Sequence, residues 1–389
     1  MKQMNFLQQS FQVHFSFPVY FTQHLFTTSN TVLREFFEQQ QSDIVKKLLF
    51  VIDDGVMANH PNLAVEIEDY IRAIQGYTLS CIVNIQGGEN CKNDEQQFYK
   101  IIDAVNDYGI DRHSYLVCIG GGSAVDLAGY AAAVSHRGIR HIRIPTTVLS
   151  QNDSGVGVKN GVNYKGKKNF LGTFAPPAAV FNDYFFLTTL SDRDWRSGIA
   201  EAIKVALIKD VEFFEWLEAN AAALVTRDMT AMKYLVTRCA ALHMEHIRSG
   251  DPFELGSSRP LDFGHWSAHK LEQLSGFEIR HGEAVAIGIA LDSVYSFLSG
   301  RIDEIDAQRV VALLHTLGFA VTHPLMAIED DSSSILAGLN EFREHLGGRL
   351  TIMLLSAIGK GEEVHELDKE ILINATQWLF SRSTTQIQS

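Results

Sequence analysis

Short, mostly apolar runs that end in polar residues or glycine constrain the fold of this chain more than any other feature. They occur at residues 48–52, 80–84 and 115–119, and the third leads directly into Gly120-Gly121-Gly122. Runs of this length without polar interruption are typical of strands buried on both faces of a parallel sheet. The runs alternate with segments of helical periodicity. This alternation predicts an α/β fold with a doubly wound parallel sheet, in which ligands bind at the carboxyl ends of the strands.

The segments around these runs supply the other expected elements. Val13, Phe15, Phe17 and Val19 alternate with other residues, with the period of two that is typical of a half-buried strand. We also expect a strand at residues 141–145 and helices at 32–41, 95–108 and 124–135.

The sequence changes character after residue 190. Segments with helical spacing of apolar residues dominate from there on, and one apolar run, residues 350–358, is expected to form a strand. We therefore predict an α/β domain at residues 1–190 and a mainly α-helical domain at 191–389. The expected helices of the second domain are residues 192–217, 221–246, 265–274, 282–298 and 304–317.

Net charge and cysteine content exclude several classes of function. The 33 Lys and Arg residues against 46 Asp and Glu give a formal charge of −13, whereas nucleic-acid binding calls for a basic face. Four cysteines without a C-x-x-C pair suggest neither a disulfide framework nor a thiolate zinc site. No stretch reaches the roughly 18 apolar residues of a membrane span, and the N-terminus lacks the apolar core of a signal peptide. We expect a cytoplasmic protein with no nucleic-acid or membrane partner.

A glycine-rich turn between an expected strand and an expected helix is the first candidate site. In Gly120-Gly121-Gly122-Ser123, missing side chains let the backbone approach a pyrophosphate, whose charge suits the following helix N-terminus. Asp53 ends an earlier strand and has two interpretations: it accepts hydrogen bonds from a ribose, or it only caps a turn. Glu89 and Lys92 follow another strand at the same sheet edge.

Histidines and a glutamate form the second candidate site. His265 and His269 are four residues apart and share a helix face, as Glu201 and Lys204 do at a spacing of three. His281 opens a later expected helix. Imidazoles with a carboxylate are typical of a catalytic zinc site, which has three protein ligands and an open position. Spacing alone does not decide which three of Glu201, His265, His269 and His281 bind the metal.

A basic segment is the third candidate. Residues 153–169 contain four lysines and several glycines, and we expect a loop there that binds a phosphate or merely lies in solvent. Arg137 is a further cation that would join this group.

Taken together, these motifs resemble the 3-dehydroquinate synthase family of sugar-phosphate cyclases over about residues 45–360. The resemblance lies in ordered blocks spread along the chain. They are Gly120-Gly-Gly with Asp126-Leu-Ala-Gly129, His136-Arg-Gly138, Pro145-Thr-Thr147, Asp153 with Lys159, Lys168-Asn169, Gly198-Ile-Ala-Glu201-Ala-Ile-Lys204, Gly264-His265 with His269, and His281-Gly-Glu-Ala284.

The resemblance implies a role for each matching residue. It implies that Glu201, His265 and His281 bind Zn²⁺ or Co²⁺. Substrate would face His269, Lys159, Lys204, Asp153 and Asp262, and Arg137, Lys168 and Asn169 would hold its phosphate. NAD would be bound by Asp53, Glu89, Lys92, Gly121, Gly122, Ser123, Asp126, Thr146, Thr147 and Thr189.

The implied reaction oxidises the substrate transiently, eliminates phosphate, re-reduces the product and closes a carbocycle by an intramolecular aldol step. NAD is recycled, so the class is a carbon–oxygen lyase. The implied partner is a small phosphorylated sugar, and family members are commonly homodimers.

Three departures from the family pattern concern the substrate. Asp262 stands where an asparagine precedes the first zinc histidine and Arg259 is displaced, Met244 stands where a lysine is usual, and Glu341-Phe-Arg343 replaces a stretch rich in lysine. These changes disfavour a carboxylated substrate. They resemble the relatives that make valiolone-type cyclitols from sedoheptulose 7-phosphate.

The alternatives therefore remain a 3-dehydroquinate synthase, a valiolone-type synthase and, in another class, a metal-dependent glycerol or alcohol dehydrogenase. A non-catalytic relative that only binds a sugar phosphate or nucleotide is a lesser possibility. The zinc triad and the lysines favour a cyclase over both outside alternatives.

Overall fold

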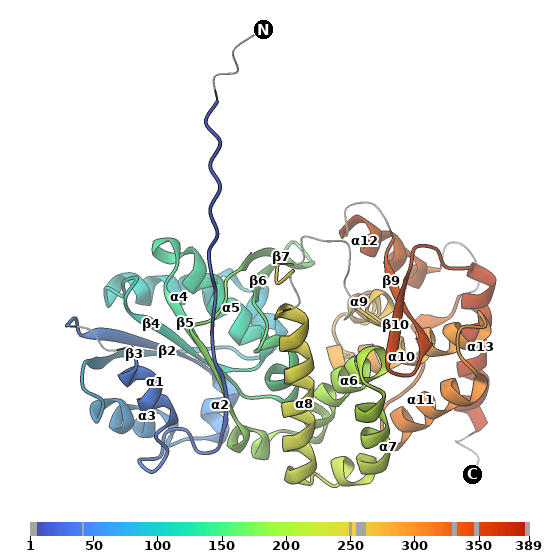
Figure 1. The fold of residues 1–389 in the computed structure, drawn as a ribbon, viewed down its shortest axis with the longest axis horizontal. Coiled ribbons are helices and arrows are strands. Elements are labelled where there is room, and N and C mark those ends of the chain that lie inside the picture. Colours follow the sequence, from blue (N-terminus) through green and yellow to red (C-terminus); the bar gives the residue numbers. More distant parts are fainter. Residues whose placement is uncertain are drawn as a thin grey trace.

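A parallel β-sheet organises the N-terminal part of the molecule. The computed structural model describes residues 6–40, 43–248, 251–253, 262–328, 333–345 and 350–385. Six parallel strands lie in the order β1-β8-β5-β4-β2-β3; β2, β3, β4 and β5 are labelled in Figure 1. The expected runs at 48–52, 80–84, 115–119 and 141–145 all fall within these strands. The strands are β1 (Val19–Thr22), β2 (Lys46–Asp53), β3 (Tyr77–Ile85), β4 (Tyr115–Gly120), β5 (Arg140–Pro145) and β8 (Ala179–Asp183).

Both faces of this sheet are covered, as the uninterrupted apolar runs predict. Leu48, Phe50 and Ile52 of β2 pack into one core with residues of α1 and α3. Leu49 and Val51 point the other way and pack with α4 and α5. The doubly wound sheet is therefore confirmed. Its helices are α1 (Val32–Glu38), α2 (Asp54–Asn59), α3 (Leu63–Arg72), α4 (Glu95–Asp107) and α5 (Gly122–Val134), with short 3₁₀ turns η1 (Glu89–Lys92) and η2 (Ser135–Arg137).

Residues 159–174 form an antiparallel hairpin, so the expectation of a loop at 153–169 is wrong for its greater part. β6 (Lys159–Tyr164) pairs with β7 (Lys167–Phe174). Lys165 and Gly166 have φ values of +48° and +78°, and two consecutive positive φ angles are what a tight two-residue hairpin turn requires. Asp153 lies just before the hairpin, in the π-helical turn η3 (Ser150–Ser154).

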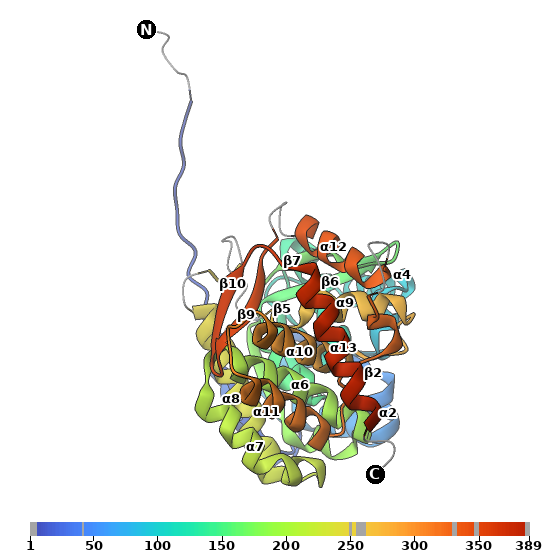
Figure 2. The same ribbon diagram turned by 90° about the vertical axis from the view of Figure 1, so that its right-hand side faces the viewer.

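The C-terminal part is mainly helical and has a single core. α10 lies at its centre, with 14 of its 18 residues buried, among α6, α9, α11 and α13 (Figure 2). The elements are η4 (Tyr184–Thr189), α6 (Asp192–Lys209), α7 (Val211–Val225), α8 (Met229–Arg248), α9 (His265–Leu274), α10 (His281–Leu298), α11 (Glu304–Thr316), η5 (Pro324–Met326), η6 (Ser334–Leu336), α12 (Ala337–His345), β9 (Ile352–Ala357), β10 (Lys360–Val364) and α13 (Lys369–Thr385).

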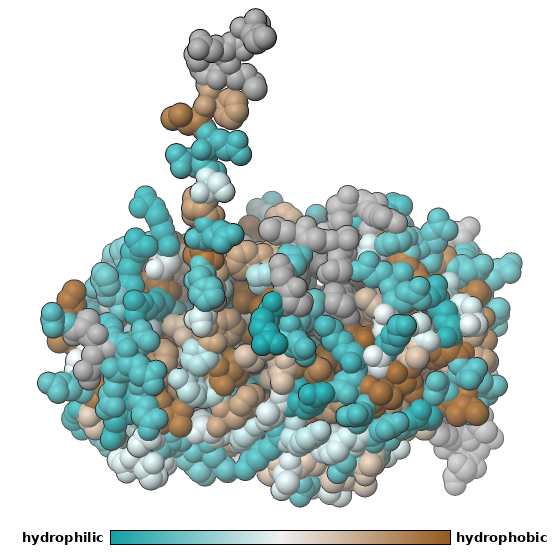
Figure 3. All heavy atoms as spheres, in the orientation of Figure 1, coloured by the Kyte–Doolittle hydropathy of each residue, from teal (hydrophilic) through white to brown (hydrophobic). Residues whose placement is uncertain are grey.

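Three further expectations about elements are wrong. The helix expected at 221–246 spans the end of α7 and most of α8, because α7 ends at Val225 and α8 begins at Met229. The helix expected at 192–217 is two helices, because Asp210 ends α6 and its side chain accepts a hydrogen bond from the Phe213 N–H at the start of α7. Residues 13–18 are not a strand: β1 begins at Val19. Phe17 still packs against the body. The chain before it extends outward with the apolar side chains of Phe6, Leu7 and Phe11 in solvent (Figure 3). Among the described residues, none of the helices is long and apolar enough to span a membrane.

Candidate active site

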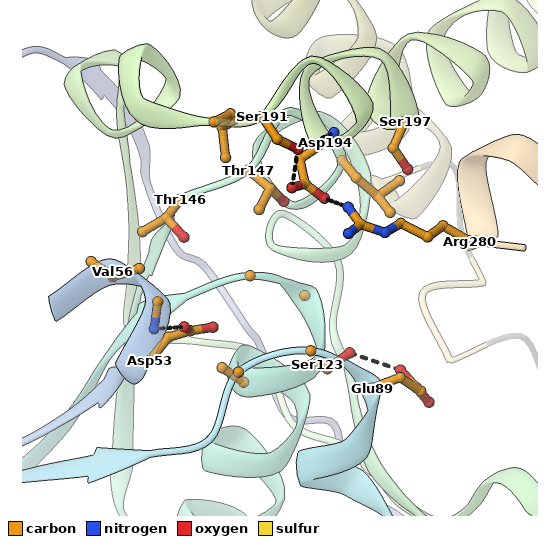
Figure 4. A pocket seen from close by; sticks show the side chains of 18 of the residues that line it. Asp53, Val56, Glu89, Ser123, Thr146, Thr147, Ser191, Asp194, Ser197 and Arg280 are labelled. Atoms are coloured by element: carbon orange, nitrogen blue, oxygen red, sulfur yellow. Dashed lines mark hydrogen bonds and ion pairs between the residues drawn. The ribbon is translucent and has the colours of Figure 1, made fainter. Parts of the chain in front are cut away.

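A cavity of about 830 Å³ lies where the carboxyl edge of the sheet meets the helical part (Figure 4). Its N-terminal wall carries eight of the residues expected to bind NAD. These are Asp53, Glu89, Gly121, Gly122, Ser123, Thr146, Thr147 and Thr189. The helical part contributes a facing wall of Ser191, Asp194, Ser197, Glu272, Arg280 and His281.

The N-terminus of α5 opens onto this cavity. Gly121 precedes the helix, and no side chain caps it, so its first backbone N–H groups remain available to an anion. A Cβ on Gly122 would come within 2.7 Å of Ser154 Oγ, so a larger residue there would displace the Ser154 side chain. The geometry suits a pyrophosphate, as the sequence motif predicts.

Asp53 serves its local structure and also faces the cavity, so its two interpretations are compatible. Its Oδ1 accepts the Gly55 N–H at 2.8 Å and caps α2. Burial raises the pKa of Asp53, while hydrogen bonds from Gly55 and its neighbours partly offset that rise. Across the cavity floor, Ser123 Oγ donates to Glu89 Oε2 at 2.7 Å and holds that carboxylate in place.

Lys92 and Asp126 were expected to contact NAD, but they do not line the cavity. Lys92 is 4% exposed and its Nζ lies 2.9 Å from Asp126 Oδ2. It also donates to the Asn169 side chain. Burial alone would lower the pKa of Lys92, but Asp126 and Glu89 outweigh it and raise the pKa above its ordinary value. The pair therefore supports the wall that carries Glu89, and direct contact with NAD stays a prediction.

Glu201, His265 and His281 come together from α6, α9 and α10, and His281 lines the cavity. Glu201 Oε1 lies 3.5 Å from His265 Nε2 and 3.2 Å from His281 Nε2, and ligand atoms of the three residues lie within 4.8 Å of one another. His265 is placed by the turn before α9. There Gly264 has φ +77°, and a Cβ would come within 2.7 Å of Ile289 N.

This trio fits a divalent metal. Glu201 is completely buried. Neither of its oxygens makes a hydrogen bond of good geometry with the part of the chain that the structure describes. Burial alone would raise the pKa of Glu201, but Lys204 and His265 outweigh it and hold the pKa well below its usual range. A buried, ionised carboxylate oxygen between two imidazole nitrogens is a donor set typical of zinc. A second group, His269, Glu272 and His281, is equally compact.

Lys204 and Asp153 lie beside Glu201, as expected for a substrate site. Lys204 is 3% exposed and pairs with Glu201. Burial lowers its pKa, but Glu201 and then Asp153 and Asp262 raise it to about 12, so Lys204 is a buried cation. Asp153 contacts His243 Nδ1 at 3.0 Å. Burial and Glu201 would raise the Asp153 pKa, but His243 and Lys204 bring it below its ordinary value.

The expected phosphate-binding residues are only partly brought together. Lys168 lines the cavity, and its Nζ lies 2.9 Å from Glu272 Oε1. Asn169 is held by Lys92, and Lys159 is exposed at the start of β6. Arg137 is exposed in η2, which follows the C-terminal end of α5, whereas the cavity lies at the N-terminal end of that helix. The structure therefore does not bring Arg137 to the cavity, and a role for Arg137 in phosphate binding stays a prediction.

Sequence reasoning missed several residues of the site. Glu272 bridges Lys168 and His281, Asp194 pairs with Arg280 across the helical wall, and His243 contacts Asp153. Glu272 follows His269 by three residues, so both lie on one face of α9. That spacing could have identified Glu272 as a residue of the site. Nothing local distinguishes Asp194, Arg280 or His243 from residues of an ordinary helix surface.

The fold and the trio Glu201, His265 and His281 together define a class of α/β protein. In this class a cleft suited to a nucleotide, at the edge of a parallel sheet, lies beside a candidate metal site on helices. The comparisons with known proteins narrow this class. The chain matches the family model for 3-dehydroquinate synthase N-terminal over residues 82–197 and that for 3-dehydroquinate synthase C-terminal over residues 198–337. The 3-dehydroquinate synthase of Shewanella sp. (strain MR-4) is 34% identical over 358 residues, which are 92% of this chain and 95% of that protein. The chain belongs to the 3-dehydroquinate synthase family.

Solved structures agree with this assignment. The 2-epi-5-epi-valiolone synthase from Streptomyces hygroscopicus subsp. jinggangensis 5008, with NAD⁺ and Zn²⁺ bound, is 29% identical with a TM-score of 0.86, covering 97% of this chain and 100% of that chain. A 2-deoxy-scyllo-inosose synthase complexed with carbaglucose-6-phosphate, NAD⁺ and Co²⁺ shares the fold at 24% identity and a TM-score of 0.75, covering 92% of this chain and 96% of that chain. A probable glycerol dehydrogenase from Sinorhizobium meliloti 1021 has the same fold at 16% identity and a TM-score of 0.61, with coverage of 94% and 98%. Fold alone thus does not separate cyclases from dehydrogenases.

Proposed function

We propose that this protein is a sugar-phosphate cyclase that uses NAD and a divalent metal, Zn²⁺ or Co²⁺, to convert a phosphorylated ketose into a carbocycle with release of phosphate. One observation carries the proposal. The trio Glu201, His265 and His281, of which His281 is partly exposed, lies with Lys204 beside a cavity whose other wall is the glycine-rich end of α5. A dehydrogenase needs no buried lysine next to its metal, whereas elimination of phosphate creates anionic oxygens that a lysine stabilises.

The walls of the cavity divide the work. In the proposal, the α5 N-terminus and the threonines Thr146 and Thr147 hold the dinucleotide, and Asp53 accepts hydrogen bonds from a ribose. Glu201, His265 and His281 hold the metal. When bound, NAD takes and returns a hydride and the metal polarises a substrate oxygen. We place the domain boundary near residue 190, so that the first domain supplies most NAD contacts and the second supplies the metal ligands.

The chain's own groups then manage charge and protons. Lys204, which stays charged over the whole physiological range, stabilises oxygens that become anionic during oxidation and elimination. His269 adjoins the metal trio at a ring-centroid distance of 5.4 Å from His265 and presents an imidazole that can accept or donate a proton. Lys168 and Asn169 bind the phosphate in this proposal.

The residues near the other end of the substrate site favour a substrate without a carboxylate. Met244, which stands where a cation is usual in the family, packs against Val156, Val180 and Ala240. Asp262 lies close enough to Lys204 to raise its pKa and so adds negative charge there. A carboxylated substrate would meet an apolar side chain and a like charge. We therefore propose sedoheptulose 7-phosphate as the substrate, so that the product would be a cyclitol of the valiolone type.

The second candidate substrate is 3-deoxy-arabino-heptulosonate 7-phosphate, favoured by the 34% identity to a 3-dehydroquinate synthase. Purified protein with NAD and Zn²⁺ should be assayed for inorganic phosphate release from each of the two sugars. We expect release from sedoheptulose 7-phosphate and little from the carboxylated sugar. Release from the carboxylated sugar alone would refute the substrate assignment. Accumulation of NADH from a simple alcohol without phosphate release would refute the cyclase.

A further inference from the structure

His281 lies between two carboxylates, each of which faces one of its ring nitrogens. Its Nε2 is 3.2 Å from Glu201 Oε1, and its Nδ1 is 3.1 Å from Glu272 Oε2. Glu272 comes from α9, and its side chain is 5% exposed. A histidine binds a metal through one nitrogen, and its other N–H then needs an acceptor.

The surroundings decide which nitrogen faces the metal. On the Nε2 side, Glu201 Oε1 also lies 3.5 Å from His265 Nε2, so two imidazole nitrogens converge on one carboxylate oxygen. On the Nδ1 side, both Glu272 oxygens are engaged, one with His281 and the other with Lys168 Nζ at 2.9 Å. A cation held by His269, Glu272 and His281 would have to break these contacts beside the charged Lys168. The Nε2 side therefore suits the metal better.

We propose that Glu272 is a positioning residue, which accepts the Nδ1–H of His281 and thereby directs Nε2 toward the metal, without itself binding the metal. This inference rests on the metal site of the proposed function. A carboxylate behind a metal-binding histidine fixes its tautomer and ring orientation and makes it a stronger ligand.

The contact with Lys168 extends this role across the cleft. Lys168 lies on β7 of the N-terminal part, whereas Glu272 and His281 lie on α9 and α10 of the helical part. The chain of contacts from Lys168 to Glu272 to His281 thus joins the proposed phosphate-binding hairpin to the metal centre. Removal of the Lys168 charge should weaken metal binding less than removal of Glu272, because Lys168 acts on His281 only through Glu272.

The test measures metal affinity, so it needs neither substrate nor turnover. The Zn²⁺ dissociation constant is determined by competition with a chromogenic chelator for wild type, Glu272→Gln, Glu272→Ala and Lys168→Met. Glu218→Ala is the matched control, because Glu218 also pairs with a cation on a neighbouring helix, Arg309. Urea unfolding of each chelated protein shows whether it is folded.

We expect Glu272→Ala to weaken Zn²⁺ binding by about 10- to 100-fold. Glu272→Gln should lie between it and wild type, because its amide oxygen still accepts the Nδ1–H, and Glu218→Ala should bind as wild type does. Equal affinity of wild type, Glu272→Gln and Glu272→Ala would overturn the inference, and so would complete loss of binding in both variants, which would make Glu272 a direct ligand. If Glu272→Ala does not fold, the isosteric Glu272→Gln decides. Failure of the wild type to bind Zn²⁺ would instead refute the metal site of the proposed function.

Discussion

Buried charges of the candidate site depend on one another at the scale of single residues. Glu201 is completely buried and Lys204 nearly so, and each shifts the pKa of the other toward its charged form. Loss of one partner from a buried pair leaves an uncompensated charge, which costs far more than the pair itself contributes. Residues of this site therefore cannot be changed singly without consequences for stability.

Glu201→Gln should remove both the metal and a large share of stability. The amide cannot balance Lys204, so we expect the free energy of unfolding to fall by about 3–5 kcal/mol even in chelator, where metal makes no contribution. Metal content by mass spectrometry and urea unfolding measure the two effects. The control Glu218→Gln, at a partly exposed pair, should cost no more than about 1 kcal/mol. A variant that keeps a full equivalent of metal would disprove the assignment of Glu201.

Asp292 should make stability depend on pH. Its Oδ2 accepts the Gly264 N–H at 2.9 Å and its Oδ1 accepts Trp266 Nε1–H at 3.0 Å, on either side of His265. Burial raises the Asp292 pKa to about 7, and these hydrogen bonds only partly offset that rise. Because the folded pKa lies above the unfolded one, the stabilisation is fully present below about pH 4 and is lost as the pH rises through 7.

Asp292→Asn does not titrate, so it isolates this contribution. We expect the variant to be less stable at pH 4.5, by about 1–3 kcal/mol, because the amide cannot accept both N–H groups. Its deficit relative to wild type should shrink between pH 4.5 and 7.5. Urea unfolding at both pH values checks this, and a deficit that stays constant would show that Asp292 does not titrate in this range.

Some residues of the candidate site were predictable, because their chemistry requires particular residue types in a recognisable order along the sequence. Glu201, His265 and His281 come together as the resemblance implies, and Gly121 and Gly122 line the cavity. Glu272 escaped because an acidic residue on an amphipathic helix normally lies in solvent, and only the packing of α9 against α10 turns it inward. Lys92 and Asp126 show the opposite error: both were expected to contact NAD, but they do not line the cavity. Their mutual ion pair was not visible in the sequence.

At the scale of elements, apolar pattern predicted the buried strands well and the boundaries of other elements poorly. The apolar runs of β2 and β4 are buried on both faces of the sheet, so the interpretation of these runs as buried strands was unambiguous. Helical periodicity continues across Asp210, however, and does not reveal that the chain changes direction there. The β6–β7 hairpin has no uninterrupted apolar run of four or more residues, so its strands were not visible in the apolar pattern.

Asp210 should stabilise the packing of α6, α7 and α8 against one another. Its Oδ1 accepts the Phe213 N–H at 3.1 Å and its Oδ2 accepts Arg238 Nε–H at 2.8 Å. Asp210→Ala removes the cap and the ion pair, so we expect a loss of about 1–3 kcal/mol in the free energy of unfolding. Asp210→Asn keeps a capping oxygen and should lose less. Equal stability of the alanine and asparagine variants, measured by urea unfolding, would show that the cap contributes nothing.

At the scale of the whole molecule, the site forms at a junction between two parts that differ in architecture. The strand edge and α5 are predictable from the N-terminal sequence. The candidate metal trio follows from the family resemblance, because spacing alone left four candidate ligands open. Which helical residues face the glycine turn was not predictable, because it depends on how α6 and the segment before α10 pack. Arg193 pairs with Glu283, and Arg280 pairs with Asp194. These two partly exposed pairs link α6 to the start of α10 on the helical side of the cavity.

This arrangement predicts that NAD binding protects both parts of the molecule from hydrogen exchange. The cavity wall includes Asp53 and Gly121 from the sheet side and Asp194 and Arg280 from the helical side, so a ligand that fills it contacts both. We expect slower exchange at residues 53–60 and 120–124 and also at 191–197 and 277–281, measured by mass spectrometry with and without saturating NAD. Ligand binding to the folded state suppresses opening more strongly as the free ligand concentration rises above Kd. The hairpin of β9 and β10, which does not line the cavity, is the internal control and should not change. Protection confined to the sheet side would mean that the helical wall does not take part in NAD binding, and only the sheet side of the cavity would then be assigned to NAD.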